Sequence, residues 1–245
     1  FEEDRLSSYF EYDDAGGSFV RAGDVGVEGS GGMRVHFDQG QVGAGALHLA
    51  FGDTPDPYFD PVDAGSANYR EVYWRLYVRY EDGWTGGGGA KLSRSMIFAR
   101  SDWSQAMIAH VWSGGDQDEH LVIDPASGTD ESGTLQTSGY NDFSNLRWMG
   151  AETSDTPVFA PENVGEWHCV EARVRLNGAG QSDGVFRLWI DGQLEAERTG
   201  LNWVGSYDDY GINAVFVSNY WNDGSPAAQE RYIDNFVVST ERIGC

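Results

Sequence analysis

The sequence predicts an all-β protein built from two stacked antiparallel sheets. Segment after segment is rich in β-branched and aromatic residues and is bounded by Gly, Asp, Asn or Pro, while hardly any segment has a helical pattern. The 33 glycines and the 13% of aromatic residues suit many strands joined by tight turns. No internal repeat of fixed period is visible, which argues against a propeller or a solenoid.

Strands are expected, in chain order, at residues 18–27, 32–37, 45–51, 70–80, 95–100, 105–112, 120–124, 170–176, 184–190, 213–219 and 232–239. The segment at 70–80 shows the reason well. Its alternate residues Val72, Trp74, Leu76 and Val78 form one apolar face, as in a strand that covers a core.

The pattern is clearest in two neighbouring segments. Their apolar positions are Val170, Ala172, Val174 and Leu176 in the first, and Phe186, Leu188 and Ile190 in the second. Polar or aromatic residues stand between them, so each strand has one buried face. Residues 177–184 supply turn chemistry, and Asp191-Gly192 supplies another turn, so we expect an antiparallel hairpin.

Composition bounds the class of protein. We expect a single domain over residues 1–245, because two-sheet sandwiches of this size commonly share one core. The net charge of −23 comes from 39 acidic and 16 basic residues, and Lys91 is the one lysine. Such a charge repels a phosphate backbone, so nucleic acid is not an expected partner. No run of about 18 apolar residues occurs, so we expect no membrane span, and we expect a monomer.

Two features suggest an extracellular or periplasmic setting. The chain starts at Phe1 without an initiator methionine, which suggests the mature form of a secreted or cell-surface protein. Cys169 and Cys245 are the two cysteines, and in an oxidising compartment we expect them to form a disulfide. The alternative is two unrelated thiols.

Arginine and aromatic side chains alternate on the polar faces of several predicted strands. They are Tyr73, Arg75, Tyr77 and Arg79 in one segment, and Arg173, Arg175, Arg187 and Trp189 in the hairpin. Aromatic rings stack on sugars, and guanidinium groups grip carboxylates or sulfates through two hydrogen bonds. We therefore expect these residues to line a groove that binds polysaccharide. The alternative is that the arginines pair with neighbouring acids on a solvated sheet.

Candidate catalytic residues stand on two other strands. Alternation along 105–112 puts His110 and Trp112 together on the open face of the sheet. Near the C-terminus, Tyr220 is expected on the face opposite Val215 and Val217. The remaining histidines have no partner that the sequence identifies.

Trp167, which opens one strand, and Trp189-Ile190-Asp191-Gly192, which closes the next, resemble the concanavalin A-like jelly-roll proteins. That superfamily includes lectins, polysaccharide lyases and glucanases. The resemblance implies a jelly roll with a concave groove that handles carbohydrate. The E-x-D-x-x-E strand of jelly-roll glucanases is absent, which argues against glycoside hydrolysis.

The order Arg, His, Tyr along the chain is similar to that of the jelly-roll alginate lyases. It implies that Arg100 binds a uronate carboxylate, that His110 stabilises the enolate or acts as base, and that Tyr220 acts as base or acid. The chain has Ile108-Ala109-His110 where those lyases have Gln-Ile-His. Its tyrosine segment also lacks their lysine and glycine.

The chain ends resemble those of β-sandwich carbohydrate modules, in which an early Glu and an Asp of the last strand hold a structural Ca²⁺. This resemblance implies Glu2 and Asp234 as ligands, whose hard oxygens suit Ca²⁺. The alternative is that they are ordinary surface acids. The acidic loop at Asp116, Asp118 and Glu119 lacks the spacing of an EF-hand. We expect no organic cofactor.

The leading hypothesis is a polysaccharide lyase that cleaves an acidic, uronate-containing polymer by β-elimination. The alternatives are a lectin-like protein that binds carbohydrate without cleaving it, or a cell-surface adhesion module. The glycine-rich run at 83–89 joins two predicted strands and is a candidate lid over the groove, and 124–161 is a long polar insertion.

Overall fold

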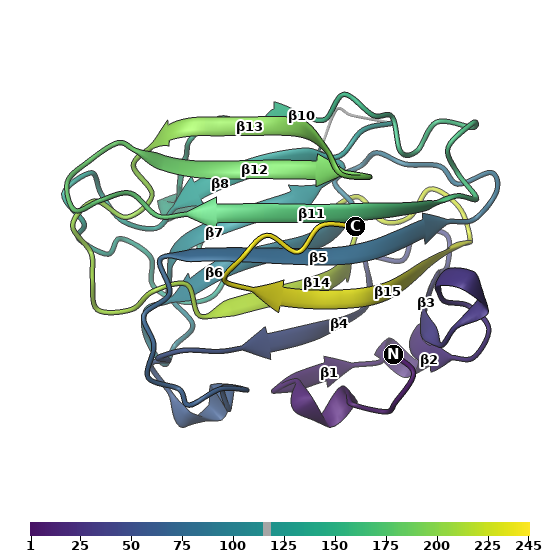
Figure 1. Cartoon of the computed structure of the whole chain (residues 1–245), viewed down its shortest axis with the longest axis horizontal. Coiled ribbons are helices and arrows are strands. Elements are labelled where there is room, and N and C mark those ends of the chain that lie inside the picture. The colour runs from purple at the N-terminus through teal and green to yellow at the C-terminus, as the bar shows by residue number, and fades with distance from the viewer. Residues whose placement is uncertain (115–118) are drawn as a thin grey trace.

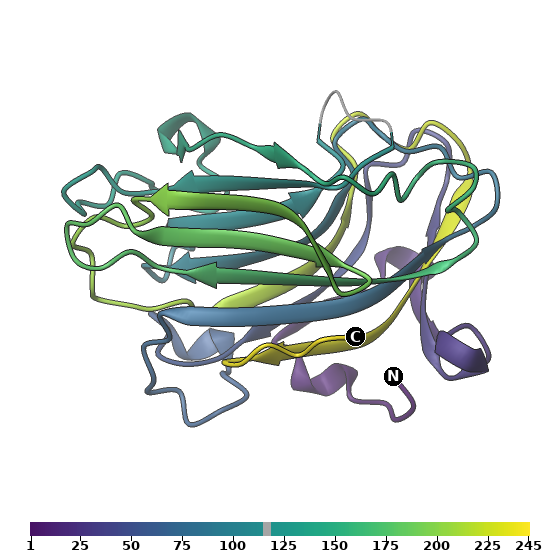
Figure 2. The same ribbon diagram turned by 45° about the horizontal axis from the view of Figure 1, so that its top comes forward.

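Two antiparallel sheets pack face to face in the computed structural model, which describes residues 1–114 and 119–245 (Figures 1 and 2). Sheet A has the spatial order β1 (Glu11–Asp13), β4 (Gly43–Ala50), β14 (Ala214–Tyr220), β6 (Lys91–Phe98), β7 (Gln105–Trp112), β8 (Val122–Ser127) and β10 (Glu152–Thr153), and β9 (Arg147–Trp148) pairs with β8. Sheet B has the order β13 (Gln193–Leu201), β12 (Gly184–Ile190), β11 (Trp167–Arg175), β5 (Glu71–Tyr80), β15 (Gln229–Ser239), β3 (Gly32–Phe37) and β2 (Phe19–Ala22).

The all-β prediction is confirmed. The described residues contain no α-helix, and their helices are the 3₁₀ turns η1 (Leu6–Ser8), η2 (Ala15–Gly17), η3 (Val27–Gly29), η4 (Pro57–Phe59) and η5 (Phe143–Asn145). None of these is long or apolar enough to cross a membrane.

The core lies between the sheets, where the period-2 patterns predicted it. Val72, Trp74, Leu76 and Val78 of β5 are at most 1% exposed. The expected hairpin is β11 and β12, which pair antiparallel from Val170–Ile190 to Arg175–Val185. The predicted disulfide is also confirmed, since Cys169 of β11 is bonded to Cys245. It fixes the C-terminal tail on the outer face of sheet B (Figure 1).

Four strands, β1, β9, β10 and β13, were not predicted, and β6 is longer than predicted. β6 begins at Lys91 instead of Ser95, because Ser93, Arg94 and Ser95 are all buried and the alternation of polar and apolar residues is lost. β13 was not predicted, because this edge strand is mostly polar and exposed, and contributes only Ala196 and Leu201 to the core.

The glycine-rich run connects β5 in sheet B with β6 in sheet A and packs against the end of the sandwich. Its Trp84 is 6% exposed. A side chain at Gly88 would meet Trp221 Nε1 at 2.6 Å, and one at Gly89 would meet Asn222 Nδ2 at 2.7 Å, both at positive φ. These glycines thus permit close backbone packing, and the expected lid is not formed. Asp116 and Asp118 of the predicted acidic loop lie outside the described residues.

Candidate functional site

The predicted site residues are divided between two faces of the sandwich. His110, Trp112 and Tyr220 belong to strands of sheet A, whereas the arginine and aromatic set of β5, β11 and β12 lies on the outer face of sheet B. The hydrophobic core separates the two faces. The expectation that all these residues line one groove is therefore wrong, because an alternating pattern identifies the polar face of a strand but not the sheet to which it belongs.

A row of polar and aromatic side chains crosses the outer face of sheet A. The cross-strand register gives the row as Glu11, His48, Phe216, Arg94, His110 and Asp124. A pocket of about 310 Å³ lies on this face. Its lining includes His48, Lys91, Arg94, Tyr140, Asn141, Asn219 and Tyr220. Tyr140 and Asn141 come from the polar insertion, which thus forms one wall.

Arg94 is the central cation of this pocket. It is 6% exposed, and its Nη1 donates to Asn141 Oδ1 at 2.9 Å while its Nη2 donates to the Tyr140 hydroxyl. The guanidinium also lies over the Phe216 ring, 5.6 Å from the centroid. Several other arginines form ion pairs with carboxylates, but within the described residues Arg94 has no such partner. Such a cation attracts an anionic ligand.

Lys91 is a second cation in the same pocket. Its Nζ lies 4.2 Å from the centroid of the Trp112 ring, which belongs to the neighbouring strand β7. Burial, reinforced by the charge of Arg94 and opposed by Asp124, lowers the pKa of Lys91 to about 8. A substantial fraction of the amine is therefore neutral slightly above neutral pH, as a general base requires. Tyr220, 48% exposed, lines the pocket with it.

His110 faces the same side of sheet A but is covered. It is 2% exposed, and neither ring nitrogen has a hydrogen-bond partner among the described residues. The Trp148 ring of β9 stacks on the imidazole with centroids 5.9 Å apart. Burial, with smaller effects of Lys91 and Arg94, holds the His110 pKa well below its ordinary value, so the ring is neutral. A sugar would reach His110 only if Trp148 moved aside.

Arg100 does not lie beside His110. It stands in the exposed turn after β6, and Arg94 is the arginine directly opposite His110 in the sheet. The prediction passed over Arg94 because the strand was expected to begin at Ser95, the residue after Arg94.

A second group that sequence analysis missed involves His48. Its Nδ1 lies 2.8 Å from Glu11 Oε2, and the Tyr58 hydroxyl donates to Glu11 Oε1 at 2.6 Å. Burial lowers the pKa of His48, although Glu11 opposes the shift. The partners are 37 and 47 residues apart in sequence, so no local motif marks them.

On sheet B, most of the predicted arginines have acidic neighbours. Arg173 Nε donates to Glu71 Oε1 at 2.7 Å, Arg187 pairs with Glu197, and Arg175 Nη1 lies 3.8 Å from Asp183 Oδ2. For Arg173, Arg175 and Arg187, the structure thus agrees with the alternative that the arginines pair with neighbouring acids on a solvated sheet. Arg75 instead donates to the carbonyl oxygens of Gly244 and Asn235. Arg79 lies over the rings of Trp167 and Tyr232.

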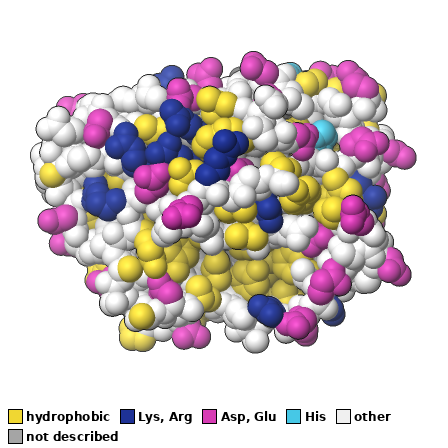
Figure 3. All heavy atoms as spheres, viewed as in Figure 1, with side chains coloured by type: hydrophobic (Ala, Val, Ile, Leu, Met, Phe, Trp, Pro, Cys, Tyr) yellow, Lys and Arg dark blue, Asp and Glu magenta, His cyan; other side chains and the backbone are white. Residues whose placement is uncertain are grey.

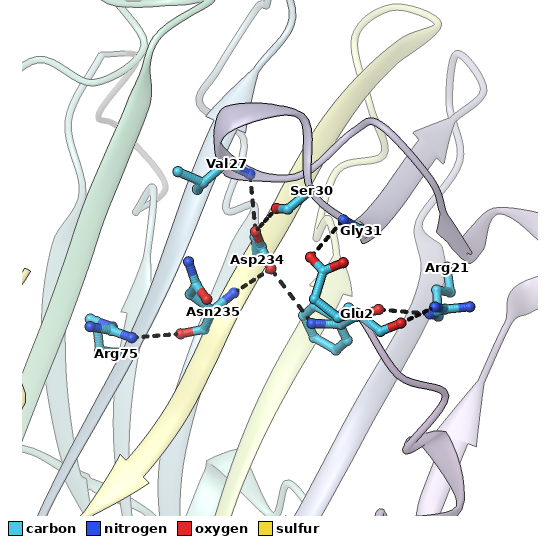
Figure 4. A network of polar contacts seen from close by, with 9 residues as sticks. Glu2, Arg21, Val27, Ser30, Gly31, Arg75, Asp234 and Asn235 are labelled. Carbon is cyan, nitrogen blue, oxygen red and sulfur yellow. Dashed lines mark hydrogen bonds and ion pairs between the residues drawn. The ribbon is translucent and has the colours of Figure 1, made fainter.

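Glu2 of the N-terminal segment and Asp234 of β15 lie near one another on sheet B (Figure 4). Asp234 is 2% exposed, and its carboxylate accepts hydrogen bonds from Val27 N (3.0 Å), Ser30 Oγ (3.0 Å) and Asn235 N (2.7 Å). Glu2 Oε1 accepts from Gly31 N at 2.8 Å, and the Phe1 ammonium lies 3.7 Å from Asp234 Oδ1. In residues 1–114 and 119–245, no three His, Cys, Asp or Glu side chains are grouped to hold a metal. The Phe1 ammonium beside Asp234 shows that this carboxylate accepts a cationic neighbour, and carboxylate oxygens are the type of ligand that Ca²⁺ takes.

No protein-family model matches the sequence, and no curated protein sequence matches it either. Solved structures do match. An alginate lyase from Chlorella virus is similar with a TM-score of 0.62 and 15% identity over 95% of this chain and 100% of its own. An endo-β-1,4-glucuronan lyase from the fungus Trichoderma reesei is similar with a TM-score of 0.62 and 15% identity, over 96% of this chain and 92% of its own. A mutant alginate lyase in complex with an alginate trisaccharide is similar with a TM-score of 0.55 and 14% identity, over 86% of this chain and 82% of its own. The chain therefore has the jelly-roll fold that these uronate polysaccharide lyases share.

Proposed function

We propose that the protein is a lyase that cleaves a uronate-containing polysaccharide by β-elimination on the outer face of sheet A. The observation that carries the proposal is Arg94, a nearly buried guanidinium that lines the pocket with no acidic partner in the described chain. A nearly buried guanidinium without a carboxylate partner carries a desolvation cost, which a bound anion would offset.

Each residue has a role in this proposal. Arg94 binds the uronate carboxylate and spreads its charge, which makes the C5 proton more acidic. Lys91 in its neutral form removes that proton, and the electron pair forms the C4=C5 double bond as the C4–O4 bond breaks. The Tyr220 hydroxyl donates a proton to the leaving oxygen, and solvent then restores both groups.

His48 and His110 have supporting roles. His48, oriented by Glu11, lines the pocket and offers a neutral imidazole for hydrogen bonds to sugar hydroxyls. His110, also neutral, is proposed to contact the enolate or the sugar once Trp148 is displaced. Arg100 stays outside the mechanism because it lies in an exposed turn.

A lectin-like protein is the second candidate, and one observation favours it. Trp148 seals His110, while Tyr140, Phe143, Trp148 and Tyr220 are each more than a third exposed, as in a surface on which sugar rings stack. We also propose an extracellular or periplasmic location, which the disulfide supports. Glu2 and Asp234 would hold a structural Ca²⁺ in place of the Phe1 ammonium.

A panel of polyuronates distinguishes the two functions. The protein is incubated with each polymer, and the ultraviolet absorbance of the unsaturated product and retention on the immobilised polymer are recorded. A rise in absorbance supports the lyase. Retention without any rise on any polymer supports the lectin-like protein instead.

A further inference from the structure

We propose that the outer face of sheet B is a second, non-catalytic binding surface for acidic polysaccharide. Its cations are Arg75, Arg79, Arg173, Arg175, Arg187 and Arg242. Figure 3 shows basic side chains gathered over β11 and β12, on a protein whose net charge is −23. Because the core lies between this surface and the Arg94 pocket, the two bind independently.

The cross-strand pairing of Arg173 and Arg187 supports this proposal most strongly. They are direct cross-strand partners in β11 and β12, an arrangement in which like charges destabilise a sheet. Each uses its Nε for one glutamate, Glu71 and Glu197 respectively. Their terminal nitrogens make no hydrogen bond to the described residues, so two adjacent guanidinium groups can still donate to a carboxylate or sulfate.

Neighbouring groups extend the surface along the strands. Arg175 follows Arg173 on the same face at about 7 Å, twice the rise of a strand residue. The rings of Tyr73 and Trp189 stack with centroids 6.4 Å apart, and Arg173 lies over Tyr73. Cations repeated along a sheet match a ligand with repeated anionic groups, whereas Trp189, which is only 7% exposed, supports the guanidinium groups from below.

The C-terminal tail adds a further cation. The Cys169–Cys245 disulfide fixes the tail to β11, and Glu171 accepts hydrogen bonds from Ile243 N (2.7 Å) and Gly244 N (3.1 Å). Arg242 is thereby held over the Trp189 ring, 4.8 Å from its centroid, with 49% of its side chain exposed.

The test is affinity electrophoresis of the whole protein in native gels containing alginate at low salt. Every variant carries Arg94→Ala, so that the pocket contributes neither binding nor cleavage. Arg187→Ala should weaken the apparent Kd about five- to tenfold, as expected for one strong charge contact. The matched control is Arg5→Ala, which removes another glutamate-paired arginine that does not belong to the β11–β12 arginine cluster and should change the Kd less than twofold.

A second variant, which should strengthen binding, distinguishes a lost contact from a misfolded protein. Glu197→Gln releases the Arg187 guanidinium and should strengthen binding two- to fivefold, whereas Glu3→Gln, the partner of Arg5, should have little effect. Loss of all retardation in Arg94→Ala alone would overturn the proposal. Equal effects of Arg187→Ala and Arg5→Ala would also overturn it, because the binding would then depend on net charge alone. Neither result bears on catalysis in the Arg94 pocket.

Discussion

Loss of the disulfide should lower the stability of the protein strongly. Cys169 and Cys245 are 76 residues apart, and for a loop of this length the chain-entropy estimate is about 4 kcal/mol at 25 °C. For a chain of this size 1 kcal/mol corresponds to about 2–4 °C in Tm. Reduction should therefore lower the Tm by about 8–16 °C. The bond closes the tail onto β11, so the contacts of Glu171 with the tail should be lost with it.

Scanning calorimetry with and without a phosphine reductant measures the effect. The variant Cys245→Ser should melt at the temperature of the reduced wild type and should not respond to the reductant. Thiol titration of the unfolded, unreduced wild type should find no free thiol. A change in Tm below about 2 °C, or two titratable thiols, would refute the reasoning.

Three other predictions concern the pocket and the proposed calcium ligands. Tyr220→Phe should lower turnover on the order of a hundredfold and leave polymer binding nearly intact, because only the proton donor is lost; full turnover would remove Tyr220 from the mechanism. If neutral Lys91 is the base, kcat should rise with pH through about 8, as the amine loses its proton, and Lys91→Arg should abolish this limb; a flat profile would contradict it. Ca²⁺ should raise the Tm of the wild type but not of Asp234→Asn, and equal responses would exclude Asp234 as a ligand.

The sequence pattern predicted much of the fold because one face of most strands is buried. Alternation in β5, β7 and β12 correctly assigned Trp74, Ala109 and Leu188 to the core. It did not show that His110, which was expected on an open face, is covered by Trp148. The disulfide was predictable because the chain has two cysteines.

The site was harder to predict, for two physical reasons. Arg94 lies in a buried polar run, where the outer face of the sheet is covered by the insertion and periodicity gives no signal. The insertion residues Tyr140 and Asn141 come beside it only through tertiary packing. The unusual status of Lys91 as the one lysine was visible in the sequence, but its place in the pocket was not.

The central claim is elimination at the Arg94 pocket, and one comparison tests it most directly. The initial rate at which C4=C5 ultraviolet absorbance appears is measured on each polyuronate for the wild type, Arg94→Ala and the surface control Arg5→Ala. The account predicts unsaturated product from the wild type and from Arg5→Ala, and a loss on the order of a hundredfold or more in Arg94→Ala. Equal rates in Arg94→Ala and the wild type, or no unsaturated product from any polyuronate that the wild type binds, would contradict it.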